Sequence, residues 1–297
     1  MAATQPWTTA ALGFGAHDVP QQAAITFAEH RTQTPPTDVA HLVLIVLATA
    51  AGSAVNSIAG GGTLITFPAL VGLGVPGIVA NATSTVALVP GSVGAILGYR
   101  TALQGARAWA LRFAVPSLLG GACGAGLLMI TPPERFDAIV PWLVLGATLL
   151  FVIQRPMMRL LKNRGSTTTP GTDPTERPAP IALLLFQFAV AVYGGYFGAG
   201  IGIIMLAALG FMGFKSIHRM NGLKSIGGTC ANVMAAGTFA MSHLVNWPIA
   251  GAMMVGAIAG GYGGSRLAQR VSQDWVRRTI IAVGLGSGLW LLMGGLR

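Results

Sequence analysis

Charged side chains are scarce in this 297-residue sequence. Asp, Glu, Lys and Arg make up 9% of it and hydrophobic residues 53%. An ordinary soluble domain carries about 25% charged residues, so a soluble fold of this size is excluded, as are disordered and collagen-like chains. Cysteine is nearly absent too, since Cys123 and Cys230 lie alone in apolar stretches. This excludes a disulfide-stapled scaffold, and we expect no metal site and no cofactor.

Acidic residues are fewer than basic ones, eight against eighteen, which gives a formal net charge of +10. A nucleic-acid-binding protein would place such charge on a soluble face interleaved with aromatic residues. Here Lys and Arg lie at the ends of long apolar runs. That distribution is typical of membrane proteins, whose basic residues collect in cytoplasmic loops. The expected partner is therefore the lipid bilayer and not a nucleic acid.

Uncharged runs suited to crossing a bilayer recur along the chain. A crossing of about 30 Å takes about 20 helical residues. Eight runs of about this length lie near residues 39–59, 79–98, 111–131, 138–154, 180–197, 220–241, 246–265 and 278–296. Two further apolar pieces, 63–74 and 201–213, are too short to cross as regular helices. The sequence predicts an all-α polytopic membrane protein.

An internal repeat divides the chain. Glycines, short apolar pieces and polar helix positions recur in the same order at an offset of about 140 residues, which predicts two halves of about five segments each. The expected organisation is a polar N-terminal tail (1–38), a first membrane repeat (39–154), a cytoplasmic linker (155–180) and a second membrane repeat (181–297). The matched positions are Gly60, Gly62 and Ile65 with Gly198, Gly200 and Ile203, Asn81 and Thr85 with Asn221 and Ser225, and Gly120, Gly121 and Gly124 with Gly260, Gly261 and Gly264.

The distribution of Lys and Arg favours one orientation of the two halves. If each short segment is a re-entrant hairpin, each half has four spans and the basic residues divide 10 to 7 between the membrane faces. If each short segment crosses, each half has five spans and the division becomes 14 to 3. Because positive charge sorts strongly to the cytoplasm, the second arrangement is favoured. The halves are then inverted repeats, the linker is cytoplasmic and both termini are periplasmic.

A glycine cluster precedes each short segment, and this pattern indicates a binding site. Inverted repeats with interrupted helices at matching positions bind substrates near the bilayer midplane, and the exposed N–H groups of a broken helix favour an anion. The alternative is that the glycines only allow close helix packing, an interpretation we prefer for Gly121 and Gly261. The candidate anion ligands are Gly60, Gly61, Gly62 and Thr63 in the first half and Gly198 and Gly200 in the second.

A polar face on the helix after each short segment is the second signal. Polar groups in lipid are costly without partners, so this face should meet a cavity or another polar group. Ser and Thr can instead bond carbonyls of their own helix. Helical spacing places on one face Asn81, Ser84, Thr85, Leu88 and Ser92 in the first half and Asn221, Lys224, Ser225, Gly228 and Asn232 in the second.

Lys224 is the one basic residue placed well inside a predicted span, and no Asp or Glu lies in any span core. A lone ammonium in lipid is expensive unless it meets an anion or a hydrated cavity. We therefore weigh contact with the substrate against a second interpretation, in which Lys224 reaches one turn to the cytoplasmic interface beside Lys215 and Arg219.

The sequence Asn56-Ser-Ile-Ala-Gly-Gly-Gly-Thr-Leu-Ile-Thr-Phe-Pro-Ala-Leu70, followed by Asn81-Ala-Thr-Ser-Thr85, resembles the first half of the sulfite exporter TauE/SafE family. The stretch from Gly198 to Gly202, with that from Asn221 to Asn232, is similar to the family's second repeat. The resemblance spans about residues 40–296. It implies a multi-pass protein of the bacterial inner membrane that moves sulfur-containing oxyanions such as sulfite, sulfoacetate or other organosulfonates.

The resulting hypothesis is export of a small anion by alternating access, with two inverted halves moving around a shared site. An anion channel of the same fold and a membrane scaffold without transport are the alternatives, and a homodimer is compatible with each. An enzyme is not expected, because no nucleophile, base and orienting group come together in the sequence. The expected substrate-binding residues are Asn56, Gly60, Gly61, Gly62, Thr63, Asn81, Ser84, Thr85, Gly198, Gly200, Asn221, Lys224, Ser225 and Asn232.

Overall fold

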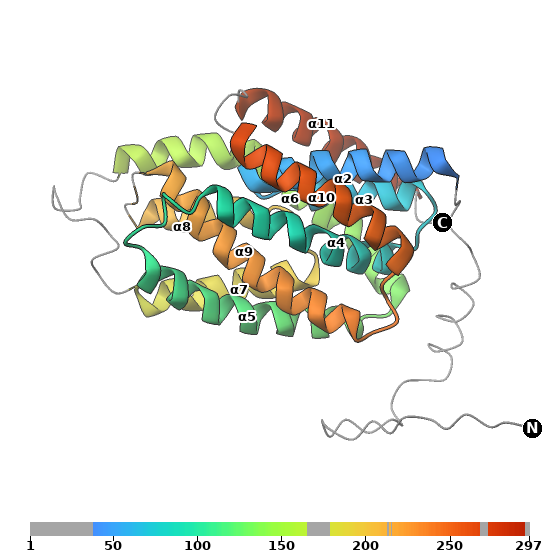
Figure 1. The fold of residues 1–297 in the computed structure, drawn as a ribbon, viewed down its shortest axis with the longest axis horizontal. Coiled ribbons are helices and arrows are strands. Elements are labelled where there is room, and N and C mark those ends of the chain that lie inside the picture. Colours follow the sequence, from blue (N-terminus) through green and yellow to red (C-terminus); the bar gives the residue numbers. More distant parts are fainter. Residues whose placement is uncertain (1–37, 165–178, 213, 215, 268–272, 295–297) are drawn as a thin grey trace, which may run out of the picture. The chain divides into compact units, whose positions relative to one another are not determined.

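The computed structural model describes residues 38–164, 179–212, 214, 216–267 and 273–294 (Figure 1). Over these residues the chain forms helices and no strand, within one unit that comprises Pro35–Arg297. The first half holds α2 (Val39–Ala59), α3 (Thr63–Gly72), α4 (Gly77–Gly98), α5 (Arg107–Met129) and α6 (Pro133–Arg164). The second half holds α7 (Ile181–Tyr196), α8 (Ile201–Phe211), α9 (Ile217–Ala240), α10 (Trp247–Leu267) and α11 (Gln273–Leu292).

Each predicted apolar segment corresponds to one of these helices, so the all-α prediction is confirmed for the described residues. Four of the described helices are long and apolar enough to cross a membrane by length and composition: α2, α4, α5 and the first part of α6, Pro133–Ile153. The α6 helix continues to Arg164, so the first ten residues of the predicted linker are helical. The rest of that linker up to residue 178, and the predicted tail up to residue 37, lie outside the described residues.

The two short helices begin at backbone breaks that glycine makes possible. The α3 and α8 helices have 10 and 11 residues, and at 1.5 Å per residue each covers about 15 Å, half of the hydrocarbon core. Gly60 ends α2 with φ 81°, while Gly198 and Gly200, just before α8, have φ 83° and 77°. Only glycine adopts this left-handed conformation without strain. The glycine clusters therefore interrupt the helices where the sequence predicted.

The helices of the two halves pair in a reciprocal pattern. In one set α10 packs against α2 and α4, and in the other α5 packs against α7 and α9. Exchanging the halves converts one set into the other. Two further extensive contacts, α4 with α9 and α6 with α11, join corresponding helices. Each half therefore contributes its fourth helix, α5 or α10, to the other half.

Glycines at these crossings let the helix backbones touch. A Cβ on Gly121 of α5 would clash with the backbone of Ala231 in α9, and one on Gly261 of α10 would clash with the backbone of Gly91 in α4. The partner positions 91 and 231 are 140 residues apart, as are 121 and 261. The interpretation of Gly121 and Gly261 as packing residues is confirmed.

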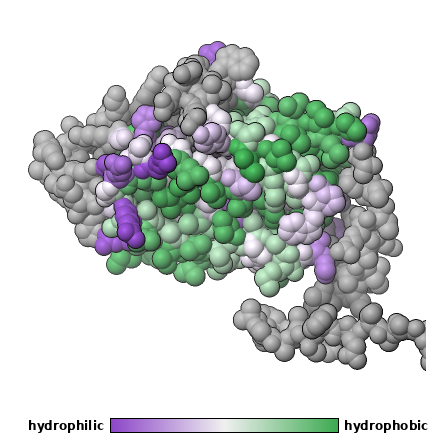
Figure 2. All heavy atoms as spheres, viewed as in Figure 1, coloured by the Kyte–Doolittle hydropathy of each residue, from purple (hydrophilic) through white to green (hydrophobic). Residues whose placement is uncertain are grey.

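One end of the unit, which we call the basic end, gathers the connections that carry arginine. A cluster that includes Trp109, Leu183, Phe214 and Met220 joins the connection after α4 with the starts of α7 and α9. Figure 2 shows strongly hydrophilic residues toward one end of the unit and a largely hydrophobic surface beside them. Arg219 lies at this end, because its Nε donates to Ala102 O, and Arg100 and Arg107 flank the same connection in the chain.

At the opposite end the start of α4 meets the connection between α9 and α10, where the Asn246 N–H donates to Thr83 Oγ1 at 3.0 Å. Phe136, at the start of α6, lies beside Tyr196, at the end of α7, with ring centroids 6.1 Å apart. Arg135 neighbours Phe136 in the chain and therefore lies at this end. The α4 and α7 helices each run between the two ends, but in opposite directions.

Arg277, near the start of α11, binds two carbonyls of α6, one of which a proline leaves open. Its Nε donates to Phe151 O and its Nη2 to Val152 O, both at 2.9 Å. Pro156, four residues after Val152, has no N–H to give that carbonyl.

Arg277→Gln should therefore lower the free energy of unfolding by about 1–3 kcal/mol, measured by thermal unfolding in detergent. In a Pro156→Ala background the new N–H satisfies Val152 O, and the loss should shrink; an equal loss in both backgrounds would contradict this account.

Candidate functional site

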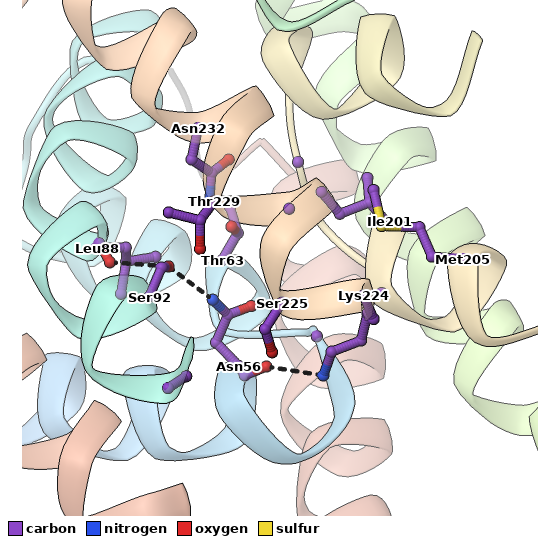
Figure 3. Close-up of a pocket in the computed structure, with 15 residues that line it drawn as sticks. Asn56, Thr63, Leu88, Ser92, Ile201, Met205, Lys224, Ser225, Thr229 and Asn232 are labelled. Atoms are coloured by element: carbon purple, nitrogen blue, oxygen red, sulfur yellow. Dashed lines mark hydrogen bonds between the residues drawn. The ribbon is translucent and has the colours of Figure 1, made fainter. Parts of the chain in front are cut away.

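A pocket of about 470 Å³, including space open to the outside, lies where the two glycine breaks approach the central helices α4 and α9 (Figure 3). A Cβ on Gly60 would clash with the backbone of Gly202, so the break in one half directly contacts the start of α8 in the other. The pocket is lined by Asn56, Gly60, Thr63, Leu88, Ser92, Ala95, Gly198, Ile201, Gly202, Met205, Lys224, Ser225, Gly228, Thr229 and Asn232.

Lys224 supplies the positive charge of the pocket. Its side chain is 3% exposed, and its Nζ donates to Ser57 O at 3.2 Å and to Asn56 O at 3.4 Å. These carbonyls belong to the last turn of α2, where the helix dipole favours a cation. The side chain is therefore buried in the protein, and it does not extend to the cytoplasmic interface as the second interpretation required.

The charge of Lys224 has no carboxylate near it. The sequence contains no Asp or Glu from residue 39 to 133 or from 177 to 273, and these stretches include α2 to α5 and α7 to α10. Among the described residues that line the pocket, Lys224 is the one ionisable side chain. A buried ammonium with carbonyl partners alone keeps an attraction for an anion.

Polar side chains surround the rest of the pocket. Asn56 Nδ2 donates to Ser92 Oγ at 3.4 Å, and Ser92 Oγ donates to Leu88 O at 3.0 Å. Thr229 is 7% exposed, and its hydroxyl has no hydrogen-bond partner among the described residues. Figure 3 shows Ser92 and Thr229 on one side and the apolar Ile201 and Met205 on the other. The pocket thus combines one cation, several hydrogen-bond donors and an apolar wall.

Half of the fourteen expected substrate-binding residues line this pocket. These seven residues come from α2, from both glycine breaks and from α9. In the sequence, only the internal repeat indicated that these segments meet. The structure therefore brings together Asn56, Gly60, Thr63, Gly198, Lys224, Ser225 and Asn232.

Three expected substrate-binding residues of α4, Asn81, Ser84 and Thr85, do not line the pocket, because other groups bind them. Asn81 Nδ2 donates to Tyr196 O, the last residue of α7, at 2.9 Å. Ser84 Oγ lies 2.6 Å from Thr66 Oγ1, and Thr85 Oγ1 donates to Asn81 O of its own helix at 2.9 Å. The contacts of Asn81 and Ser84 join α4 to α7 and α3, and that of Thr85 lies within α4.

The remaining predicted residues also do not line the pocket. A Cβ on Gly61 would clash with the ring of Phe151 and one on Gly62 with the backbone of Gly52. Gly200 faces Ala147 of α6. Asn221 is 6% exposed, and its Oδ1 has no partner among the described residues. Gly61 and Gly62 serve close packing, whereas Gly200 supplies the left-handed backbone conformation, φ 77°, that precedes α8.

The set predicted from sequence omitted Ser92 and Thr229. Ser92 already belonged to the polar face of α4, and its repeat counterpart at an offset of 140 is Asn232, which was predicted. Thr229 follows Ser225 by four residues, so the same helical face includes it. Both signals were present in the spacing. The sequence gives no signal that distinguishes apolar lining residues, such as Ile201 and Met205, from the other apolar residues of the membrane helices.

The site is asymmetric although the fold repeats. Position 224 corresponds to position 84 at the offset of 140, so a lysine in one half replaces a serine in the other. Asn81 of α4 binds the last carbonyl of α7, whereas Lys224 of α9 binds the last turn of α2. Each central helix therefore binds the interrupted helix of the opposite half, and only one of these two contacts brings a charge.

A helical membrane unit that encloses a polar, cationic pocket beside two interrupted helices defines a membrane transporter. The chain belongs to the sulfite exporter TauE/SafE family, whose model matches residues 44–291. It is 27% identical to a probable membrane transporter protein of Haemophilus influenzae over 77% of this chain and 86% of that protein.

Two further relatives carry similar names. The chain is 30% identical to a probable membrane transporter protein of Xylella fastidiosa strain 9a5c, over 74% of this chain and 82% of that protein. It is 28% identical to the probable membrane transporter protein YfcA of Escherichia coli K12, over 81% and 85%. No solved structure matches the chain significantly.

Proposed function

We propose that this protein transports small sulfur-containing anions, such as sulfite, sulfoacetate or other organosulfonates, across the bacterial inner membrane. The observation that carries the proposal is the buried ammonium of Lys224, which lines a pocket without any carboxylate. Sulfite and sulfonate oxygens accept hydrogen bonds, and Lys, Asn, Ser and Thr side chains can donate them. The family's description as sulfite exporters supports the substrate class and the outward direction.

The proposed mechanism is alternating access by two inverted repeats. The reciprocal pairing of α10 with α2 and α4, and of α5 with α7 and α9, supports two equivalent halves. The corresponding helices α4 and α9 run in opposite directions, because the start of α4 meets the connection after α9 and the start of α9 meets the connection after α4. This, and the separation of Arg135 from the basic end, support an inverted arrangement. In this proposal the basic end and the linker are cytoplasmic and both termini are periplasmic. The pocket lies between the halves, so that moving one against the other would open it to alternate sides.

Flux into proteoliposomes tests the function directly. Purified protein should give saturable uptake of labelled sulfite, sulfoacetate or methanesulfonate, and preloading the vesicles with the same unlabelled anion should accelerate it. Flux that rises linearly with concentration and shows no such acceleration would indicate a channel. Absence of flux for all three probes, with protein shown to be folded and incorporated, would reject the proposal and favour the scaffold.

Thr229 offers a substitution that separates binding from folding. Because its buried hydroxyl has no partner among the described residues, Thr229→Val should leave thermal stability unchanged or slightly raised. If the hydroxyl binds the anion, the half-saturating concentration should rise about fivefold to tenfold, as for the loss of about 1–1.5 kcal/mol of hydrogen bonding.

The matched control for Thr229 is Thr238→Val in the same helix, where the hydroxyl is bonded to Met234 O at 2.9 Å and is exposed. This variant should keep the wild-type half-saturating concentration. An unchanged value in Thr229→Val as well would remove Thr229 from the proposed site.

A further inference from the structure

We propose that Lys224 is the coupling site of this transporter and carries one proton across the membrane with each monovalent anion. The inference rests on the proposed function and assigns its coupling ion. It depends on three features of the pocket: the position of the side chain, the hydrogen bonds of its nitrogen and the absence of any other ionisable group from the lining.

The position of Lys224 makes it part of both states of a moving site. It projects from α9, in the second half, and binds carbonyls of α2, in the first half. The same pocket is bordered by the glycine breaks of both halves at Gly60 and Gly198. A group at this junction is exposed to whichever side the pocket opens toward, as a coupling site must be.

The hydrogen bonds of the amine suit both protonation states. An ammonium has three donors, and two bonds, to Asn56 O and Ser57 O, are present here. A neutral amine has two N–H donors and can keep both. When the ammonium loses its third hydrogen, both carbonyls therefore keep a donor. When the amine gains that hydrogen again, it offers an anion one more donor and one positive charge.

Charge balance then couples the proton to the anion. When the ammonium is paired with a monovalent anion, the loaded pocket is neutral and can reorient without moving net charge. If the pocket is empty and the ammonium keeps its proton, reorientation moves a full charge through a medium of low dielectric. The sequence of events is binding of one proton and one anion on one side, reorientation of the neutral pair, and release of both on the other. The empty pocket returns with a neutral amine, so one proton and one anion move together.

No neighbouring group replaces Lys224 in this role. The Tyr99 hydroxyl shares the acceptor Ser57 O, at 3.5 Å, and lies outside the lining. The α8 helix carries no titratable residue, and α2 has only His41, in its first turn. The other titratable or charged groups on the elements packed around α9, and on α9 itself, are Arg107, Arg112, Cys123, Tyr193, Tyr196, His218, Arg219 and Cys230, and none of them lines the pocket.

The first test follows internal pH in proteoliposomes that contain a trapped pH dye. Methanesulfonate is the probe, because it stays a monovalent anion across the working range and its own titration adds nothing. An inward gradient of methanesulfonate should acidify the lumen, with one proton for each anion. An alkaline lumen should drive accumulation of labelled methanesulfonate in the vesicles. A potassium diffusion potential should not drive this accumulation. Saturable flux without acidification would overturn the inference while leaving the proposed function intact; absence of flux for all three anions would reject the function itself.

The second test assigns the proton to Lys224. Arginine keeps its charge at every accessible pH, so Lys224→Arg should still exchange internal for external methanesulfonate, because exchange requires only the loaded, neutral state. Net flux and acidification should fall at least tenfold. Arg219→Gln, which removes a charge from the same helix outside the pocket, should keep both. Two outcomes would overturn the assignment. One is that Lys224→Arg acidifies the lumen at the wild-type rate, and the other is that this variant loses methanesulfonate exchange as well as net flux.

Discussion

Lys224→Ala should abolish high-affinity anion transport. The substitution removes the positive charge of the pocket and the donor to Ser57 O and Asn56 O. Hydrogen bonds that involve a charged group contribute about 1.5–3 kcal/mol, so the half-saturating concentration should rise about tenfold to more than a hundredfold. Initial rates of labelled sulfite or methanesulfonate uptake over a wide concentration range measure the change.

Two companion variants separate this effect from unfolding. Lys224→Met keeps most of the side-chain volume and removes a buried charge that has no carboxylate partner, so it should unfold at the wild-type temperature or above and yet transport as poorly as the alanine variant. Arg219→Ala removes a positive charge near the start of the same helix, where Arg219 Nε donates to Ala102 O at 3.4 Å, and should keep transport. Normal transport by Lys224→Met would mean that the lysine only tethers α2.

Most of the helical layout follows from local sequence. Uncharged runs predict the long helices, and the glycine clusters that include Gly60 and Gly198 predict the two breaks. The end of α6 does not follow in this way. Basic residues after residue 154 indicate where the membrane ends, but they are good helix formers, so α6 continues to Arg164.

The site follows from the sequence only in part, because a repeat predicts two equivalent polar faces and the fold uses them differently. Ser84 of α4 binds Thr66 of the adjacent short helix, whereas its counterpart Lys224 lines the pocket. Which polar face meets a cavity depends on contacts between residues more than 100 positions apart, such as Asn81 with Tyr196. Helical spacing contains no information about those contacts.

Gly121→Val and Gly261→Val should each destabilise the protein strongly. A side chain at either position would clash with the backbone of a crossing helix, at Ala231 or at Gly91, and a backbone cannot move aside as a flexible side chain can. Overpacking typically costs about 1–3 kcal/mol, and we expect both variants at the upper end. Thermal unfolding of the purified proteins in detergent, with the yield of monodisperse material, measures the loss.

The same two helices provide controls for these variants. Gly126 of α5 and Gly263 of α10 have open space where a Cβ would lie, so Gly126→Val and Gly263→Val should unfold close to the wild-type temperature. Because the two crossings correspond under exchange of the halves, the losses in Gly121→Val and Gly261→Val should also be similar in size. A large loss for only one of them would mean that the two halves do not contribute equally to the fold, and would weaken the case for two equivalent repeats around the Lys224 pocket.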